Sequence, residues 1–138
     1  MTSAPGDSGD PIATPSPIPH QGFLALDCPD IDDQTHTVTA GQTRLRFRTA
    51  CGSDHFQNGN DNVDISAIPA WSIQDCMLAC TAYSRANEDA PCVAVTFNAD
   101  LNWINIEGGN CWLKSRADGD VGNADASRAN SVAEAIVL

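Results

Sequence analysis

The chain has 138 residues, of which 42% are hydrophobic, and its 18 acidic and 7 basic side chains give a net charge of −11 at pH 7. This length accommodates one domain with a single modest core. The charge argues against nucleic acid as a partner, because binding to nucleic acid requires Lys and Arg side chains that neutralise phosphates. No run of eighteen apolar residues is present, so we expect no insertion into a membrane.

The first 21 residues are rich in Pro, Ser, Thr and Gly and have no apolar periodicity. This composition is typical of an extended tail or linker. The sequence therefore predicts two parts, a tail over 1–21 and a folded domain over 22–138.

The domain is predicted to begin with a β-hairpin. Residues 35–39 and 43–49 have the composition of strands and are separated by a turn at Ala40-Gly41. The second segment alternates strictly, which predicts that Leu45 and Phe47 face the core. Residues 52–64 are dense in Gly, Asn and Asp and are predicted to form a loop.

A helix is expected next, from a cap at Ser72 to about Asn87. Asp75 completes a capping-box pattern with Ser72, and Trp71 is placed to pack against the first turn. Strands are expected at 92–97, 111–114 and 133–138, with a loop or ragged hairpin over 98–110. This order predicts an α+β fold, an antiparallel sheet with one packed helix. One helix face carries Ile73, Cys76, Cys80 and Tyr83.

The chain contains six cysteines, an even number, which predicts three disulfides and a secreted or extracellular protein. A zinc site is the alternative, because Cys76, Cys80, Cys92 and Cys111 offer four thiolates. We disfavour a metal, since the spacing fits no common zinc pattern and two cysteines would remain unexplained. Helix-to-strand pairing suits disulfide geometry, but the residues alone leave fifteen connectivities open.

Several segments together resemble the PAN/apple domain, in the version found in secreted fungal proteins. The resemblance covers the chain from about Cys28 to its end and implies a non-catalytic domain for contacts with proteins or carbohydrates. It also implies the disulfides Cys76–Cys111 and Cys80–Cys92, which leaves Cys28–Cys51. The segments that carry it are Cys28-Pro29, Phe47-x-x-x-Cys51-Gly52, Trp71-Ser72-x-x-Asp75-Cys76-x-x-x-Cys80, Cys92-Val93-Ala94-Val95-x-Phe97 and Cys111-Trp112-Leu113-Lys114-Ser115.

Two groups of residues are candidates for ligand binding. Trp103, with Asn102 and Asn105 beside it, combines a flat indole with amides that suit a sugar ring or a partner protein; an ordinary loop tryptophan folded onto the core is the alternative. We expect Trp71 and Trp112 to pack inside. The second group holds three of the seven basic side chains on one face of a strand: Arg44, Arg46 and Arg48.

The arginine group allows two interpretations. It can contact an anion or an acidic glycan, or it can be an outer sheet face paired with nearby carboxylates such as Asp32 or Asp33. The segment from Asp54 to Asp64 has side-chain oxygens at alternate positions, as calcium requires. Its spacing is not that of an EF-hand, so a solvated turn is favoured and calcium binding stays open.

The sequence predicts no enzyme, no cofactor and no metal, because no nucleophile lies beside a base in a recognisable pattern. The leading hypothesis is an extracellular adhesion or recognition module for a glycan or a protein, with a cell wall as one place of action. The alternative is a structural protein that self-assembles, the tail docking on a neighbouring copy.

Overall fold

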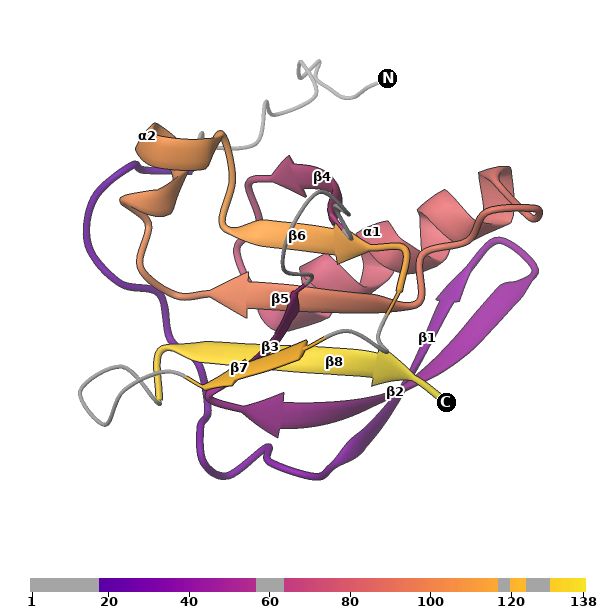
Figure 1. Ribbon diagram of the computed structural model, residues 1–138, viewed down its shortest axis with the longest axis horizontal. Helices are drawn as coiled ribbons and strands as arrows, with labels where there is room; N and C mark the ends of the chain where they lie inside the picture. The colour runs from indigo at the N-terminus through magenta and orange to yellow at the C-terminus, as the bar shows by residue number, and fades with distance from the viewer. Residues whose placement is uncertain (1–17, 57–63, 117–119, 124–129) are drawn as a thin grey trace, which may run out of the picture.

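The computed structural model describes residues 18–56, 64–116, 120–123 and 130–138. In this part of the chain a six-stranded antiparallel sheet carries helix α1 on one face and the two-stranded β3–β7 sheet on the other, and Figure 1 shows these three layers. The predicted α+β fold with one main helix and three disulfides is confirmed. Most of the predicted tail, residues 1–17, lies outside the described residues.

The large sheet has the strand order β1-β2-β8-β5-β6-β4. Central strands β8 and β5 bury both of their faces, which explains their short run of apolar and small residues. Edge strands β1 and β4 each have a single neighbour. The strands are β1 (Thr35–Ala40), β2 (Thr43–Cys51), β3 (Ser53–Phe56), β4 (Asp64–Ile68), β5 (Ala94–Asn98), β6 (Cys111–Lys114), β7 (Asp120–Asn123) and β8 (Val132–Val137).

Helix α1 (Ile73–Ala86) lies where the sequence predicts it. The Ser72 hydroxyl accepts a hydrogen bond from the Asp75 backbone N–H at 3.1 Å, which satisfies one of the free donors of the first turn. The helix covers the sheet with a face that is buried, including Ile73 and Met77. Phe47 is fully buried below it, as expected, and Leu45 packs against the same core from its margin.

Two disulfides fasten α1 to the sheet and a third closes the front of the domain. They have Cα–Cα distances of 5.4–5.9 Å, and all six cysteines take part. No thiolate is therefore left for zinc or for nucleophilic chemistry. The pairs are those that the resemblance implies, namely Cys28–Cys51, Cys76–Cys111 and Cys80–Cys92.

The expected loop over 52–64 is wrong at both of its ends. Ser53–Phe56 forms β3, which pairs with β7 some seventy residues later, and Asp64 begins β4. Gly52 has a φ of 73°, a conformation that favours glycine and that separates β2 from β3. The Asn-rich composition of 57–62 hid these strands, because their partners are distant in sequence. Residues 57–63, most of the calcium candidate, lie outside the described residues.

Trp71 was expected inside, and this prediction is wrong: its side chain is 44% exposed. The hydrophobic staple requires an apolar partner at the fourth helical position. Cys76 occupies that position, and its side chain points into the core to form the disulfide with Cys111. Trp112, in contrast, is buried as predicted.

The segment 98–110 contains a short helix, α2 (Trp103–Glu107), instead of the expected loop or ragged hairpin. Gly108 ends it with a φ of 84°. Gly109 lies so close to strand β4 that a Cβ atom there would be 2.3 Å from the Ile68 backbone nitrogen. The next residue, Asn110, is fully buried and bonds to backbone groups on both sides, so that α2 is held in a defined place.

Candidate functional site

The most exposed group of cationic side chains is the arginine row, which we define as Arg44, Arg46 and Arg48 on β2. All three are exposed, whereas Phe47 and Thr49 between and beside them are buried. The alternation of a strand therefore places the arginines on the face away from α1 and the apolar residues toward it.

A row of threonine hydroxyls lies directly beside the arginine row. Strand β1 pairs with β2 so that each arginine has an exposed threonine as its partner. The two rows form one polar surface of cationic and hydroxyl groups. The pairs are Thr39 with Arg44, Thr37 with Arg46 and Thr35 with Arg48.

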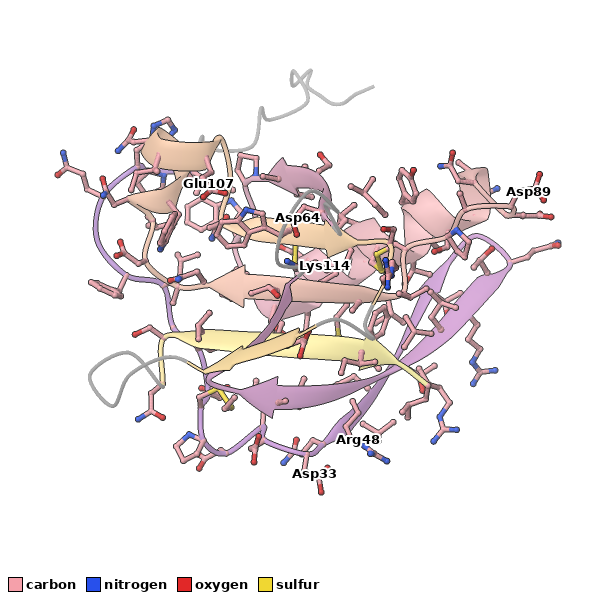
Figure 2. All side chains as sticks on the ribbon, in the orientation of Figure 1. Asp33, Arg48, Asp64, Asp89, Glu107 and Lys114 are labelled. Carbon is pink, nitrogen blue, oxygen red and sulfur yellow. A yellow bond between two sulfur atoms is a disulfide. The ribbon has the colours of Figure 1, made fainter. Side chains whose placement is uncertain are left out.

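The carboxylates that were expected to neutralise the arginines do so only at one end. Arg48 Nε lies 3.6 Å from Asp33 Oδ1, and both side chains are largely exposed. Figure 2 shows the two side chains next to each other. Asp32 instead accepts a hydrogen bond from the Cys51 backbone N–H at 2.8 Å. In the described part of the chain, Arg44 and Arg46 form no ion pair.

The β1–β2 turn brings a fourth arginine close to the hairpin. Gly41 has a φ of 60°, and a Cβ there would be 2.6 Å from the guanidinium carbon of Arg85 on α1. Arg85 thus packs against the tip of the hairpin from the helix side, while the arginine row faces the other way.

Trp103 is tied into the body of the protein. It is partly buried and meets Trp112 edge to face, with ring centroids 5.9 Å apart at an interplanar angle of 80°. The Trp112 indole N–H donates to Glu107 Oε1 at 2.9 Å. Trp103 therefore packs over Trp112. Ligand binding at the exposed part of the Trp103 ring stays a prediction.

The two asparagines beside Trp103 bond within the protein. Asn105 Nδ2 donates to the His20 backbone carbonyl at 2.9 Å and to Asn102 Oδ1 at 3.3 Å. The His20 ring nitrogen Nδ1 is 3.0 Å from Asn105 Oδ1. These contacts fasten the end of the predicted tail, at His20, to α2, so the amides have a structural role.

The structure places the two candidate groups on one face of the sheet without bringing them together. Trp112 lies on the same face as the arginine row, since it is in register with Thr96 on β5 and Glu134 on β8. Strands β8 and β5 separate β2 from β6, a distance of about 14 Å at the usual strand spacing. Sheet β3–β7 covers the space between them (Figure 1).

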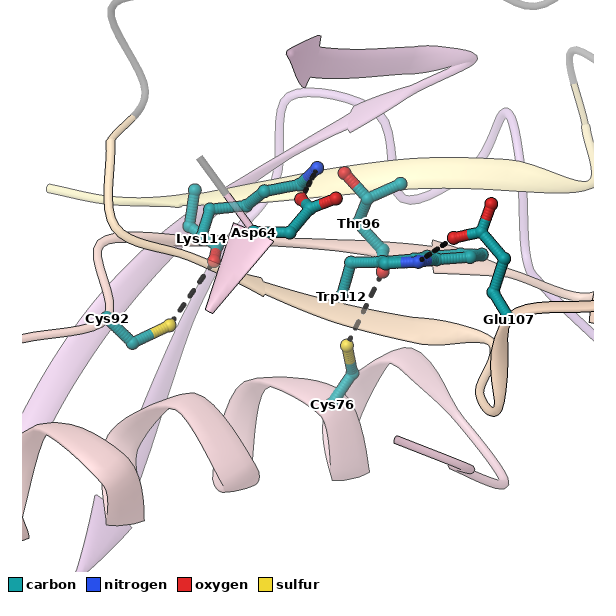
Figure 3. A network of polar contacts seen from close by, with 8 residues as sticks. Asp64, Cys76, Cys92, Thr96, Glu107, Trp112 and Lys114 are labelled. Atoms are coloured by element: carbon teal, nitrogen blue, oxygen red, sulfur yellow. Dashed lines mark hydrogen bonds and ion pairs between the residues drawn. The ribbon is translucent and has the colours of Figure 1, made fainter. Parts of the chain in front are cut away.

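The sheet face away from α1 holds buried charged side chains that the sequence did not lead us to expect. Lys114 and Glu134 are 2% and 0% exposed, and Lys114 forms an ion pair with Asp64. Figure 3 shows Lys114, Asp64 and Thr96 on the side of β5–β6 away from α1. A signal was available, because charged residues stood inside two predicted strands whose neighbours were apolar. Glu134 lies on central strand β8, which β3 contacts, whereas Lys114 lies on β6 in register with Asp64 of β4.

Other features of the described residues are negative findings. Among them, no three His, Cys, Asp or Glu side chains gather in a way that could hold a metal ion. Neither described helix has the length and apolar character needed to cross a bilayer. Comparisons of the chain with protein-family models, curated proteins and solved structures found no match.

Proposed function

We propose that this chain is a non-catalytic extracellular recognition module and that it binds an anionic ligand on the arginine row. The observation that carries the proposal is that Arg44 and Arg46 are exposed and form no ion pair with any described residue, in a chain of net charge −11. Arginines on an ordered strand that no described carboxylate neutralises are available to a ligand.

The chemistry of the row supports an anion. A guanidinium presents several N–H donors in a plane that matches carboxylate, sulfate or phosphate oxygens. Successive arginines on one strand face are about 6.8 Å apart, so the row suits a ligand that repeats its charge along an extended chain. The neighbouring threonines add hydroxyl donors and acceptors.

The rest of the domain supports recognition in an oxidising compartment. Three disulfides hold a rigid scaffold and leave no free thiol, which is typical of secreted proteins. The resemblance to the PAN/apple domain implies the same kind of role, a non-catalytic domain for contacts with proteins or carbohydrates. Action at a cell wall is part of this proposal.

The test is a titration of the oxidised protein with polygalacturonate, heparin and an oligo-glutamate peptide, with a neutral dextran as the reference. We expect at least one polyanion to bind and the affinity to fall steeply with added salt. The double variant Arg44→Ala/Arg46→Ala should weaken binding by about tenfold or more, because each lost charge-assisted bond contributes about 1.5–3 kcal/mol.

Two further variants make the result specific. Arg85→Gln removes the same charge from the helix side and should leave the affinity unchanged. Trp103→Ala tests the other candidate surface. Binding that responds to Trp103→Ala and not to the arginine variants would refute the proposal, as would the absence of binding to every polyanion at low salt.

A further inference from the structure

The backbone of β1 leaves a row of hydrogen-bonding groups that point out of the sheet. The Leu138 N–H donates to the Arg46 carbonyl at 2.8 Å, so the backbone of Arg46 faces β8. Thr49 N–H donates to the Gln34 carbonyl, so the alternate residues of β2 face β1. In this antiparallel register the outward-facing residues of β1 are Thr35, Thr37 and Thr39.

In the described part of the chain, this edge lacks the usual protection. There, strand β1 pairs only with β2, and it contains no Pro, Lys, Arg, Asp or Glu. Its one basic residue, His36, has its ring nitrogen Nε2 buried and does not guard the edge. Natural proteins block such edges with Lys, Pro, bulges or a covering segment, because an open edge is a template for another strand. The three threonines are exposed, and within the described residues their backbone N–H and C=O groups have no bonding partner.

We infer that the partner of the arginine row is an extended acidic peptide strand that pairs with the open edge of β1. The inference rests on the proposed function and identifies the ligand of the same surface. A peptide added to a sheet edge gains affinity from backbone hydrogen bonds and specificity from alternate side chains. Here the edge supplies three donors and three acceptors, and the arginines supply the charge that selects acidic side chains.

The geometry joins the two features. An added strand would lie about 9.6 Å from β2, two strand spacings away, with the threonines of β1 between them. Arginine side chains on β2 are long enough to reach across this row with their stems lying on the sheet. Alternate side chains of the added strand would stand on the same face, about 6.8 Å apart, which equals the spacing of the arginines.

This argument excludes a second copy of β1 as the preferred occupant. Two β1 strands that paired through their edges would bring threonines and arginines together on the shared face and no carboxylate. The complementary occupant is a segment with an acidic residue at every second position.

The experiment uses the oxidised full chain and three synthetic decapeptides. The first alternates Glu and Thr, the second has the same composition with the five Glu residues contiguous, and the third is the alternating peptide with N-methyl groups on the nitrogens that would face β1. We expect the alternating peptide to bind, the contiguous isomer to bind about tenfold more weakly, a loss of about 1.4 kcal/mol, and the N-methylated peptide to show no binding.

A pair of edge variants tests the same contact from the protein side. Thr37→Pro removes one outward N–H and leaves the bonds between β1 and β2 intact. It should therefore lower the affinity for the alternating peptide by about tenfold or more. Thr37→Val keeps the outward backbone N–H and loses only the side-chain hydroxyl, so it should weaken binding much less than Thr37→Pro does. Slower amide exchange at Thr35, Thr37 and Thr39 on binding would support the pairing directly. If Thr37→Pro does not fold, the N-methylated peptide tests the same backbone hydrogen bonds from the side of the ligand.

The outcomes separate this inference from the proposed function. Equal binding of the methylated and unmethylated peptides, both weakened by Arg44→Ala/Arg46→Ala, overturns the edge pairing and keeps the arginine row as the binding site. Binding of polygalacturonate or heparin and of none of the peptides makes the ligand a glycan and also overturns it. If the affinity for every bound ligand is the same for the unchanged protein and for Arg44→Ala/Arg46→Ala, the proposed function itself is refuted.

Discussion

Replacing Asn110 should destabilise the domain more than replacing any exposed asparagine. Its side chain is fully buried and makes three hydrogen bonds to the backbone: Oδ1 accepts from the Ala70 N–H at 2.8 Å, and Nδ2 donates to the Ala70 carbonyl at 3.0 Å and to the Asn98 carbonyl at 3.2 Å. These bonds join the start of α1, the end of β5 and the start of β6. No backbone group of Ala70 can turn to solvent, since that residue is 4% exposed.

The magnitude follows from the groups left without partners. Asn110→Ala strands the N–H and C=O of Ala70, and a buried polar group without a partner costs about 1–3 kcal/mol. The cavity adds to this, so we expect a loss of about 4 kcal/mol in the free energy of unfolding, a large share of the roughly 5–15 kcal/mol typical of a domain. The Tm should fall by roughly 15 °C.

Urea unfolding of the oxidised protein, followed by tryptophan fluorescence, measures this loss. Asn102→Ala is the matched control, because Asn102 is exposed and its side chain caps no helix and accepts one long, exposed hydrogen bond, from Asn105 Nδ2 at 3.3 Å; it should change the free energy by less than about 0.5 kcal/mol. If Asn110→Ala costs no more than Asn102→Ala, the assignment of Asn110 as the residue that joins these three elements is refuted.

A second substitution at the same position tests the direction of the bonds. Asn110→Asp keeps the shape and one acceptor but turns both donated bonds into contacts between oxygens. Burial and the two facing carbonyls raise the pKa of the introduced carboxyl above its value in the unfolded chain. The folded state then holds the proton more tightly, so the loss of stability is smallest in acid and grows as the pH rises toward neutrality. A loss independent of pH would contradict this account.

Three other changes have defined outcomes. Gly109→Ala should lower the free energy of unfolding by about 2 kcal/mol or more in the same urea assay, because its Cβ would be 2.3 Å from the Ile68 backbone nitrogen. His36→Leu should raise the Tm, since His36 Nε2 is buried without a hydrogen bond and removing such a group gains about 1–3 kcal/mol; a lower Tm in calorimetry would contradict this. Cys80→Ala with Cys92→Ala should cost about 3 kcal/mol through loop-closure entropy, checked by urea unfolding with both remaining disulfides verified by mass.

The sequence predicted those elements whose signals are local. Helix α1 was predicted to within a residue, because Ser72 and the spacing of Ile73, Cys76 and Cys80 act within a few turns. The β1–β2 hairpin was predicted for the same reason, since strict alternation along β2 identifies both faces.

Elements that depend on distant partners were not predicted. Strand β3 follows directly after β2 and pairs only with β7, so no local pattern marks it. Helix α2 is five residues long and is held by Asn110 and by Asn105, whose partners lie 12 to 85 residues away. The exposure of Trp71 depended on a disulfide that occupies the staple position. In each case a tertiary contact decided the local structure.

Some features of the candidate site could be predicted from the sequence and others could not. That Arg44, Arg46 and Arg48 share one outer face follows from alternation and could be predicted. The sequence could not show which arginines pair with a carboxylate. Among the described residues only Arg48 does so, because Asp32 accepts a hydrogen bond from the Cys51 backbone N–H instead. The ion pair of Lys114 with Asp64 could not be predicted either, because it depends on strand β4, which pairs with β6 and was itself unpredicted.

The distribution of the cross-links bears on where a ligand can bind. Two disulfides tie α1 to the segments of β5 and β6, and the third ends at Cys51, at the far end of β2 from its turn. Strand β1 carries no cross-link and has a single hydrogen-bonded neighbour. An added strand would give β1 a second neighbour, so binding at this edge should order a strand that is otherwise paired on one side only. Amide exchange along β1 should therefore slow more than exchange along β5 when the alternating acidic peptide binds. Equal slowing in both strands would indicate a general stabilisation of the fold and would contradict pairing at the edge.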